Sequence, residues 1–460
     1  MSSARLRAGA VDPIDRASPS DLLQLAVDRG PVPWQVGALL VTDRPLDAAA
    51  VRRALADRVR SVPRLRRRLV RTPPLCGRPV WVDDPGFAVG RHVSEARCPP
   101  PGDEAALLDI AVRSVGTRLP LDHPAWGAVV VTGLAGDRGA VVLVVHHVLA
   151  DGVGGLAALA RLLDDAPPDE HDPFPRRPPA PHRLFADALA ARVRAATHLA
   201  RGLRRVRDAA GELRAARAPR APRSSLNGPV GARRALRVVR ADLSAVRAAA
   251  HRHGGTVNDV VLAAVAGAVG HLLGGRGDGA GEIVVSVPVS SRRRTDAGRL
   301  GNAVGAQPVS VPTTGTPHTR LATVARRTAG RRSAPRGASA FLLDAAFRAV
   351  AATGALPWLL ARQRLVTTFV TDLRGPGAPV AFLGARVREI VPVVSTTGNV
   401  PVVVAALSYA GTLALAVVAD PEACPELDAL ATDLGAELEA LCRSGDGPDG
   451  DERRPGPAGT

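Results

Sequence analysis

The chain has 460 residues, 46% of them hydrophobic, so it is too long for one ordinary domain and can bury a sizeable core. Its formal net charge of +17 would suit nucleic acid, anionic lipid surfaces or coenzyme phosphates. With 3% aromatic residues, one tyrosine and no recognisable nucleic-acid module, it is not expected to bind nucleic acid.

Four cysteines are scattered without a C-x-x-C pair, which indicates neither a disulfide framework nor structural zinc and fits a reducing compartment. Near the N-terminus, charged residues such as Arg5 and Asp12 stand where a secretory leader would have an apolar run. We therefore expect a cytoplasmic protein. The positive charge adds the expectation of peripheral binding at the inner membrane face or on lipid inclusions.

Residues 18–165 carry the first globular pattern, after a polar segment at 1–17. Apolar runs of strand length alternate there with stretches in which apolar residues recur every three or four positions, which predicts strands separated by helices. The expected strands are Val36–Val41, Ala128–Thr132 and Ala140–His147, and the expected helices are Asp47–Val62 and Glu104–Val115.

Residues 166–225 connect the two halves of the chain. Proline and acidic residues at 166–182 mark a linker or surface crossing. From Arg183 to Arg223 the apolar periodicity is helical, and 11 arginines against three acidic residues place +8 of the total +17 here. We favour a helical bridge packed on its own domain with a solvated charged face. Helices lying on a membrane, with arginines at lipid phosphates, are the alternative.

Residues 226–442 form the second globular half, and the Gly-, Pro- and Asp-rich tail 443–460 is expected to be disordered. The longest uncharged apolar stretch, Val402–Ala419, is long enough to raise the question of a membrane span. Polar residues and a glycine at 408–412 favour two strands joined by a turn, so no transmembrane helix is expected. The other expected elements are strands at Ala235–Val239, Ile283–Val289 and Val387–Val394, a helix from Leu243, and helices at Asn258–Leu273 and Pro425–Leu441.

A strand that ends in two histidines is the candidate for chemistry. The apolar run Val141–Val145 leads into His146 and His147, and a glycine-bearing loop with Asp151 and Gly152 follows before a helix. Side chains alternate across a strand, so the two imidazoles point to opposite faces and only one can meet a reaction cavity. Because adjacent strand histidines diverge, they are not expected to share a metal ion.

A histidine at this position suits general-base catalysis, because its unperturbed pKa lies near neutrality. It can accept the proton of an alcohol that attacks a thioester, which typically accelerates such a step by about 10²–10⁴-fold. No serine or cysteine lies in a nucleophile-elbow pattern, which favours direct transfer over a covalent acyl-enzyme. For Asp151, bonding to backbone N–H groups or to an arginine is favoured over orienting the imidazole.

The pattern His-His-x-x-x-Asp-Gly after an apolar strand resembles the motif of CoA-dependent acyltransferases, which include chloramphenicol acetyltransferase and the condensation domains of peptide synthetases. Over nearly the whole chain, an ordered series of further segments resembles the wax ester synthase/diacylglycerol acyltransferase family. These segments are Ser18–Asp21, Gly37–Leu40, Pro63–Arg66, Pro79–Val82, Leu119–Trp126, Leu226–Pro229, Thr256–Ala263, Leu300–Asn302 and Gly384–Val387.

The resemblance implies an α+β fold, an α/β sandwich of two chloramphenicol-acetyltransferase-like subdomains around a central tunnel. It implies that His147 is the general base and that His146, Asp151 and Gly152 hold the geometry of the motif. No metal and no permanently bound cofactor are implied. Acyl-CoA is the co-substrate, and the acceptor is diacylglycerol or a long-chain alcohol, so that the products are triacylglycerol or wax esters.

The resemblance also extends to substrate-binding side chains. Asn258 and Asp259 match an Asn-Asp motif at a helix start, where they either cap the helix or place Asn258 near the thioester carbonyl or the base. Trp126 and Asn302 are the other expected substrate-binding residues, although a tryptophan at this position can equally belong to the core.

Two departures from the family pattern bear on the substrate. Ala125 stands where the family usually has the leucine of Pro-Leu-Trp, and the smaller side chain either reshapes the acyl channel or is repacked. The stretch 371–376 replaces Ser-Asn-Val-Pro-Gly-Pro and introduces Asp372 and Arg374 as a charge pair. Two rival functions stay open: acyl transfer to a non-lipid alcohol or amine, and non-catalytic binding of acyl groups or lipids. A screen of acceptors discriminates between them.

Overall fold

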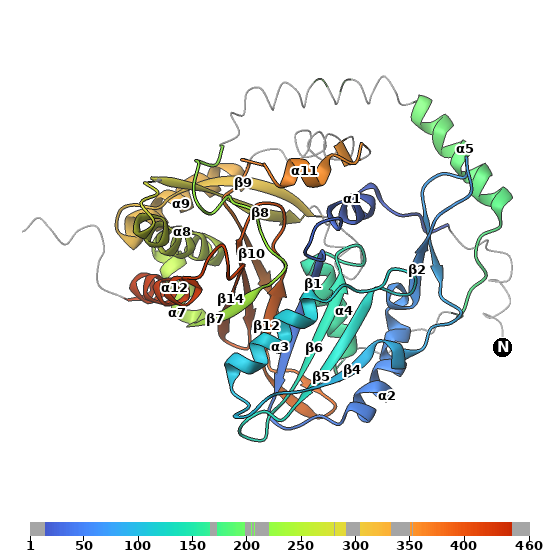
Figure 1. Ribbon diagram of the computed structural model, residues 1–460, viewed down its shortest axis with the longest axis horizontal. Coiled ribbons are helices and arrows are strands. Elements are labelled where there is room, and N and C mark those ends of the chain that lie inside the picture. Colours follow the sequence, from blue (N-terminus) through green and yellow to red (C-terminus); the bar gives the residue numbers. More distant parts are fainter. Residues whose placement is uncertain are drawn as a thin grey trace, which may run out of the picture.

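The described part of the chain folds into two six-stranded sheets and a two-stranded hairpin, with helices packed on the sheets (Figure 1). This arrangement comes from a computed structural model. The residues that it describes are 14–165, 173–197, 204, 207, 220–279, 281–290, 304–332, 350–351 and 353–443.

The first sheet completes itself with strands from both ends of the chain. In spatial order its strands are β11 (Ala381–Phe382), β12 (Ala385–Val394), β1 (Gln35–Thr42), β6 (Gly139–His146), β5 (Trp126–Thr132) and β4 (Val93–Arg97). The predicted second half, 226–442, therefore does not form one subdomain by itself, because its strands β11 and β12 belong to the first sheet. β1 pairs with β6 along one edge, and its other edge pairs with β12, which runs antiparallel to it.

Helices cover both faces of the first sheet. Leu39 and Leu40 are adjacent on β1, point to opposite faces, and are each only 1% exposed. Leu40 packs with α2 (Ala48–Arg58) and α4 (Gly152–Leu162), whereas Leu39 packs with α3 (Glu104–Gly116) and with residues of the second sheet. Burial on both faces is the reason why these strands read as continuous apolar runs instead of alternating ones.

The second sheet carries its helices on one face. In spatial order its strands are β7 (Ala235–Asp242), β14 (Thr412–Ala419), β13 (Val402–Tyr409), β10 (Thr368–Arg374), β8 (Glu282–Ser290) and β9 (Val304–Pro312). The helices that accompany it are α7 (Leu243–Arg252), α8 (Val257–Gly275), α9 (Pro317–Arg332) and α12 (Leu427–Cys442). One apolar cluster joins α7, α8 and α12 to this sheet and forms the core of the second subdomain.

The long apolar stretch is the hairpin of β13 and β14, which confirms the predicted pair of strands. The turn uses Ala410 and Gly411, both at positive φ (45° and 89°), where a glycine is favourable. Only α8, among the described residues, is long and apolar enough to span a membrane, and 72% of its apolar window is buried inside the protein.

The smaller elements lie along one edge of the molecule, at the top and right of Figure 1. They are α1 (Pro19–Val27), the hairpin of β2 (Arg67–Val70) and β3 (Val80–Asp83), α5 (Pro181–Thr197) and α11 (Leu356–Leu360). Short 3₁₀ segments occupy Val59–Ser61, Pro63–Arg66 and Val89–Arg91. We define this border, made of α1, the β2–β3 hairpin, α5 and α11, as the α1–α5 edge.

The predicted elements correspond to observed ones with shifted ends, apart from the crossover. Its helix is confirmed from Pro181 to Thr197 as α5, but residues 220–223 are not helical, so the predicted end at Arg223 is wrong. Most of the segment between them lies outside the described residues, as do the predicted loose N-terminus up to residue 13 and the tail after Arg443.

Candidate active site

The two histidines diverge where β6 ends. The strand stops at His146, one residue earlier than predicted, because the backbone turns there and the N–H of Leu149 donates to the carbonyl oxygen of His146 (2.9 Å). His146 is 0% exposed, whereas His147 is partly exposed. The backbone N–H of His147 donates to the carbonyl oxygen of Trp34 (3.1 Å), so the residue is tied to the start of β1.

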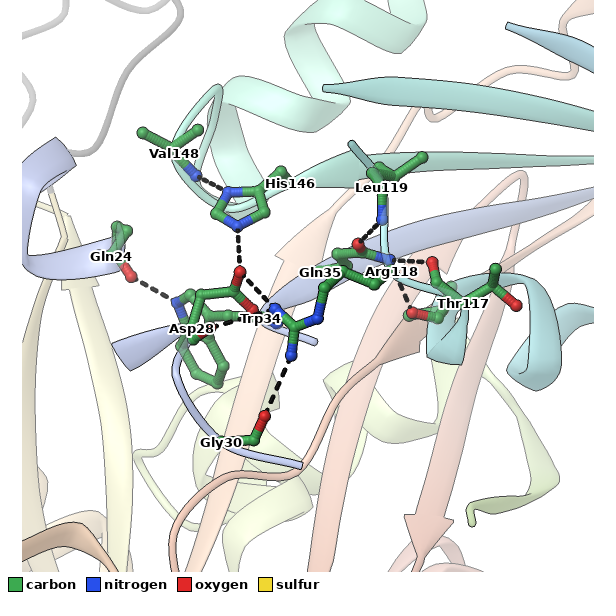
Figure 2. A network of polar contacts seen from close by, with 11 residues as sticks. Gln24, Asp28, Gly30, Trp34, Gln35, Thr117, Arg118, Leu119, His146 and Val148 are labelled. Carbon is green, nitrogen blue, oxygen red and sulfur yellow. Dashed lines mark hydrogen bonds and ion pairs between the residues drawn. The ribbon is translucent and has the colours of Figure 1, made fainter. Parts of the chain in front are cut away.

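His146 is held by both of its ring nitrogens (Figure 2). Its Nδ1 accepts a hydrogen bond from the N–H of Val148 (3.0 Å), so the ring proton must sit on Nε2. That nitrogen faces Oδ2 of Asp28 at 3.2 Å. Because the ring is fully buried, a substrate cannot reach it.

Asp28 is a nearly buried carboxylate with three donors around it (Figure 2). Besides His146, it accepts the N–H of Trp34 on Oδ1 (2.7 Å) and Nη1 of Arg118 on Oδ2 (2.6 Å), and its side chain is only 6% exposed. Burial raises the pKa of Asp28, but the hydrogen bonds from His146 and Trp34 and the charge of Arg118 outweigh it, so the net pKa lies below the ordinary value.

Trp34 is fixed at its backbone and at its ring. Its N–H is bound by Asp28, its carbonyl oxygen accepts the N–H of His147, and its indole Nε1 donates to Gln24 of α1. Next to it in the chain, the fully buried Gln35 bonds the backbone of residues 115, 117 and 119 and thereby ties the end of α3 to β1.

The ring of His147 stacks on the indole of Trp34, with centroids 4.9 Å apart and planes 18° from parallel. Its Nδ1 is enclosed by protein although the residue as a whole is partly exposed. The exposed part of the residue is therefore not Nδ1. An imidazole in this state has the chemistry of a general base.

The loop after the histidines packs against the second subdomain. Asp151 is the N-cap of α4, with Oδ1 accepting the N–H of Gly154 (2.7 Å), which is the structural role favoured from the sequence. A side chain on Gly152 would have its Cβ 3.1 Å from Cδ2 of Leu373 on β10. A larger residue at 152 would press the motif away from that strand.

A cavity of about 650 Å³ lies beside the motif and is bordered by Val148 and Ala125. Most of its walls are apolar side chains, and four arginines also border it. The lining residues are Leu22, Leu23, Leu25, Ala26, Arg29, Arg67, Arg68, Leu69, Arg71, Pro79, Trp81, Leu121, His123, Ala125, Val148 and Ala351. Apart from Ala351 they all precede residue 150, so this cavity belongs to the first subdomain and the central tunnel stays a prediction.

Trp126 does not line this cavity, contrary to the expectation of a substrate-binding residue. It is 2% exposed, its Nε1 donates to the carbonyl oxygen of Leu65 (2.8 Å), and its ring stacks on His92 at 4.5 Å. Its neighbour Ala125 borders the cavity instead. Resemblance of a motif does not say which of its side chains points inward.

Asp259 belongs to the cap of α8, the structural one of the two roles that the sequence left open. Thr256, not Asn258 or Asp259, caps α8, and Asp259 closes the capping box. One oxygen of Asp259 accepts the N–H of Thr256 and the other accepts the hydroxyl of Thr328, each at 2.8 Å. The spacing Thr-x-x-Asp is a sequence signal of this box. Asn258 is partly exposed at the second position of α8, and Asn302 lies outside the described residues.

The remaining predictions about the site concern charges and metals. Asp372 and Arg374 do not come within ion-pair distance; burial raises the pKa of Asp372, and Arg374 is exposed. Within the described ranges no group of three or more His, Cys, Asp or Glu side chains is placed to hold a metal ion. Asp28 and Arg118 were missed, because no local pattern connects residues 28, 118 and 146.

Two family models cover most of the chain. Residues 17–261 match the wax ester synthase/diacylglycerol acyltransferase catalytic domain, and residues 300–442 match the C-terminal domain of the same family. A Mycobacterium tuberculosis protein named a probable diacylglycerol O-acyltransferase is 31% identical over 434 residues, which is 91% of this chain and 93% of that protein.

Solved structures show the same fold. A wax ester synthase/diacylglycerol acyltransferase from Marinobacter aquaeolei superposes with a TM-score of 0.67 at 21% identity, covering 93% of this chain and 98% of that one. The first condensation domain of the CDA synthetase gives a TM-score of 0.61 at 20% identity, covering 94% and 96%. The chain therefore belongs to the wax ester synthase/diacylglycerol acyltransferase family and is an acyltransferase.

Proposed function

We propose that this acyltransferase transfers the acyl group of acyl-CoA directly to diacylglycerol or a long-chain alcohol, with His147 as general base. The observation that carries the proposal is a partly exposed histidine, His147, directly before Val148 in the wall of a mostly apolar cavity of about 650 Å³. Apolar walls favour a long alkyl chain over a polar acceptor.

The transfer balances without a covalent enzyme intermediate. Nε2 of His147 takes the hydroxyl proton as the acceptor oxygen attacks the thioester carbonyl carbon. The carbon–sulfur bond then breaks, and the thiolate leaves and takes the proton back from the imidazolium. The products are an ester and free CoA, and His147 returns to its neutral form.

Similar proteins support the choice of substrates. The relative from Mycobacterium tuberculosis is named as a diacylglycerol O-acyltransferase, and a starter condensation domain of the same fold was solved in complex with C8-CoA. Transfer to a non-lipid alcohol or amine is the rival function. It would require a polar acceptor channel, whereas the cavity beside the motif is mostly apolar.

The experiment supplies palmitoyl-CoA with dioctanoylglycerol, hexadecanol or a panel of polar alcohols and amines, and measures both thiol release and labelled ester. We expect neutral-lipid product from the apolar acceptors. His147→Gln should abolish it, because Gln cannot accept and return a proton at this pH. His271→Gln, on an exposed histidine of α8, is the matched control. Product from polar acceptors alone would favour the rival, and full activity of His147→Gln would contradict the mechanism.

We also propose that the α1–α5 edge binds an anionic membrane surface, from which the lipid acceptor enters the cavity. The exposed large hydrophobic side chains among the described residues all lie on or beside this edge. They are Leu75, Leu121, Phe185, Leu189, Val193, Trp358 and Leu365. Of the cavity's arginines, Arg29 and Arg71 are exposed, so their charge is available to lipid phosphates.

α5 is the clearest part of this surface. It buries Leu184 and Ala188 against the rest of the protein and exposes Phe185, Leu189 and Val193, which are spaced four residues apart and form one stripe. An apolar stripe on a basic helix is typical of a helix that lies in a membrane interface. Thus α5 combines the two interpretations of the crossover: it packs on its own domain along one side and leaves an apolar stripe facing outward.

Sedimentation with vesicles tests this surface. The protein should bind vesicles of phosphatidylcholine and phosphatidylglycerol more strongly than vesicles of phosphatidylcholine alone. Leu189→Asp with Val193→Asp should reduce binding, whereas Thr432→Asp with Ala436→Asp, at the same spacing on an exposed face of α12, should not. Equal binding by both double variants would contradict the assignment of the surface.

A further inference from the structure

The polar contacts that join Asp28, Trp34 and His146 form one connected network (Figure 2). Asp28 and His147 are both bonded to the backbone of Trp34. The carboxylate of Asp28 accepts the N–H of Trp34 at 2.7 Å, and the carbonyl oxygen of Trp34 accepts the N–H of His147 at 3.1 Å. Behind Asp28 stand His146 and Arg118, at 3.2 and 2.6 Å. A displacement of Asp28 would therefore reach His147 through a single residue.

We propose that Trp34 is a positioning residue for His147, and that the buried Asp28–His146 pair positions Trp34. This inference rests on His147 being the general base of the proposed reaction. It goes further by assigning the first histidine of the motif, Asp28 and Trp34 to one unit that sets the plane of the catalytic ring.

Stacking is the contact by which Trp34 acts on the ring. The two planes are 18° from parallel with centroids 4.9 Å apart, so rotation of the imidazole about its Cβ–Cγ bond would break the contact. A general base must present one nitrogen along the direction of the hydroxyl proton, and loss of that alignment is costly. The indole face also favours the imidazolium that forms during the reaction, by a cation–π interaction.

His146 contributes a fixed tautomer. Because Nδ1 accepts the N–H of Val148, Nε2 carries the proton and donates toward Asp28. The same hydrogen bond fixes the backbone just after His147. His146 thus holds the catalytic residue from the far side of the strand.

Two further side chains, Gln24 of α1 and Arg118, fix Trp34 and Asp28. Gln24 accepts the indole N–H of Trp34 and prevents the ring from sliding along the face of His147. Arg118, which follows α3, donates to Asp28 and, through Nη2, to the carbonyl oxygen of Gly30 (3.0 Å), so it holds the first residues of the segment that leads to Trp34. No group of this unit needs to contact the substrate for it to act.

Kinetics of three variants test the proposal with palmitoyl-CoA and hexadecanol. Trp34→Leu removes the aromatic face and should lower kcat by about 10²-fold, the size expected when a base is misplaced by about 1 Å. Trp34→Phe keeps an aromatic face and should recover most of that loss. Asp28→Asn should lower kcat as well, because the amide NH₂ group would replace one carboxylate oxygen and would face a hydrogen-bond donor. KM for palmitoyl-CoA should stay within about two-fold in all three, since none of these side chains binds the donor.

A spectroscopic readout separates this inference from the proposed reaction. In protein with isotope-labelled histidine, the carbon-bound ring protons of His147, assigned by their loss in His147→Gln, should be shifted upfield by the indole. The shift should persist in Trp34→Phe and disappear in Trp34→Leu and in Asp28→Asn. This measurement needs no turnover, so a protein that transfers no acyl group would refute the proposed reaction while the positioning of the ring is still decided.

Three results would overturn the positioning role. One is wild-type kcat in Trp34→Leu. Another is a rise in KM at unchanged kcat, which would make Trp34 a substrate contact. The third is the absence of an upfield shift of the His147 ring protons in the wild-type protein. A shift that survives in Asp28→Asn, at an unchanged melting temperature, would likewise show that Asp28 does not hold Trp34 in place.

Discussion

Ala125→Leu tests whether the cavity beside the motif receives the alkyl chain of a substrate. Ala125 borders the cavity although the residue itself is only 4% exposed, and the tryptophan that follows it is packed in the core. The side chain of a leucine at 125 must therefore extend into the cavity or press against neighbouring residues of the first subdomain. It adds three carbon atoms to the wall.

The size of the effect follows from the apolar contact that is lost. If the added carbons displace roughly two to three methylenes of a bound chain, and each buried methylene contributes about 0.8 kcal/mol, the loss is about 2 kcal/mol. That corresponds to roughly a 30-fold fall in kcat/KM for the longest chains. Chains short enough to leave this part of the cavity empty should lose little. Ala125→Val should give an intermediate loss.

The assay is a chain-length series of acyl-CoA donors from octanoyl to stearoyl, followed by a series of alcohols at one fixed donor. The series whose optimum shortens identifies the substrate that occupies the cavity. Melting temperatures of the variants exclude loss of folded protein as the cause. Unchanged optima in both series, with folded Ala125→Leu, would show that neither alkyl chain reaches Ala125 and would refute the reasoning.

Two further predictions concern the cores of the two subdomains. Burial lowers the pKa of His92 below its ordinary value of 6.5. On acidification the unfolded chain therefore takes up a proton at this histidine before the folded protein does. The free energy of unfolding should then decrease as the pH falls below 6.5. Melting temperatures from pH 8 to 5 should show the fall, with a smaller one in His92→Phe. In the second subdomain, a Cβ on Gly267 would overlap the buried ion pair of Arg320 and Glu437. Gly267→Ala should lower the unfolding free energy in urea by about 1–3 kcal/mol, the usual cost of an extra carbon in a packed core. A change within about 0.5 kcal/mol, as at a surface site, would contradict this prediction.

Local structure was largely readable from the sequence. The continuous apolar runs at Val36–Val41 and Ala140–His147 became strands because burial on both faces removes the polar alternation. The stretch Val402–Ala419 became a hairpin because polar and glycine residues at its centre suit a turn better than a buried helix. Divergence of the two histidines followed from strand geometry alone.

Other features were decided only by the tertiary structure. β12 joins the first sheet although it lies some 350 residues from β1 along the chain, since an open strand edge can be paired by any segment that the fold brings to it. Asp28, Arg118 and His146 meet because a buried carboxylate needs hydrogen-bond donors. They are so far apart along the chain that no sequence periodicity connects them.

Two residues expected to bind substrate show the same difference between sequence and tertiary structure. Trp126 and Asp259 stand in segments that resemble the family, yet one packs in the core and the other closes a capping box. By itself the sequence determined which segments become strands and helices, which family the chain resembles and where its adjacent histidines lie, because these depend on local order. Only the tertiary structure decided which side chains face the cavity and which hold His147 in place, because direction and partner depend on packing between distant segments.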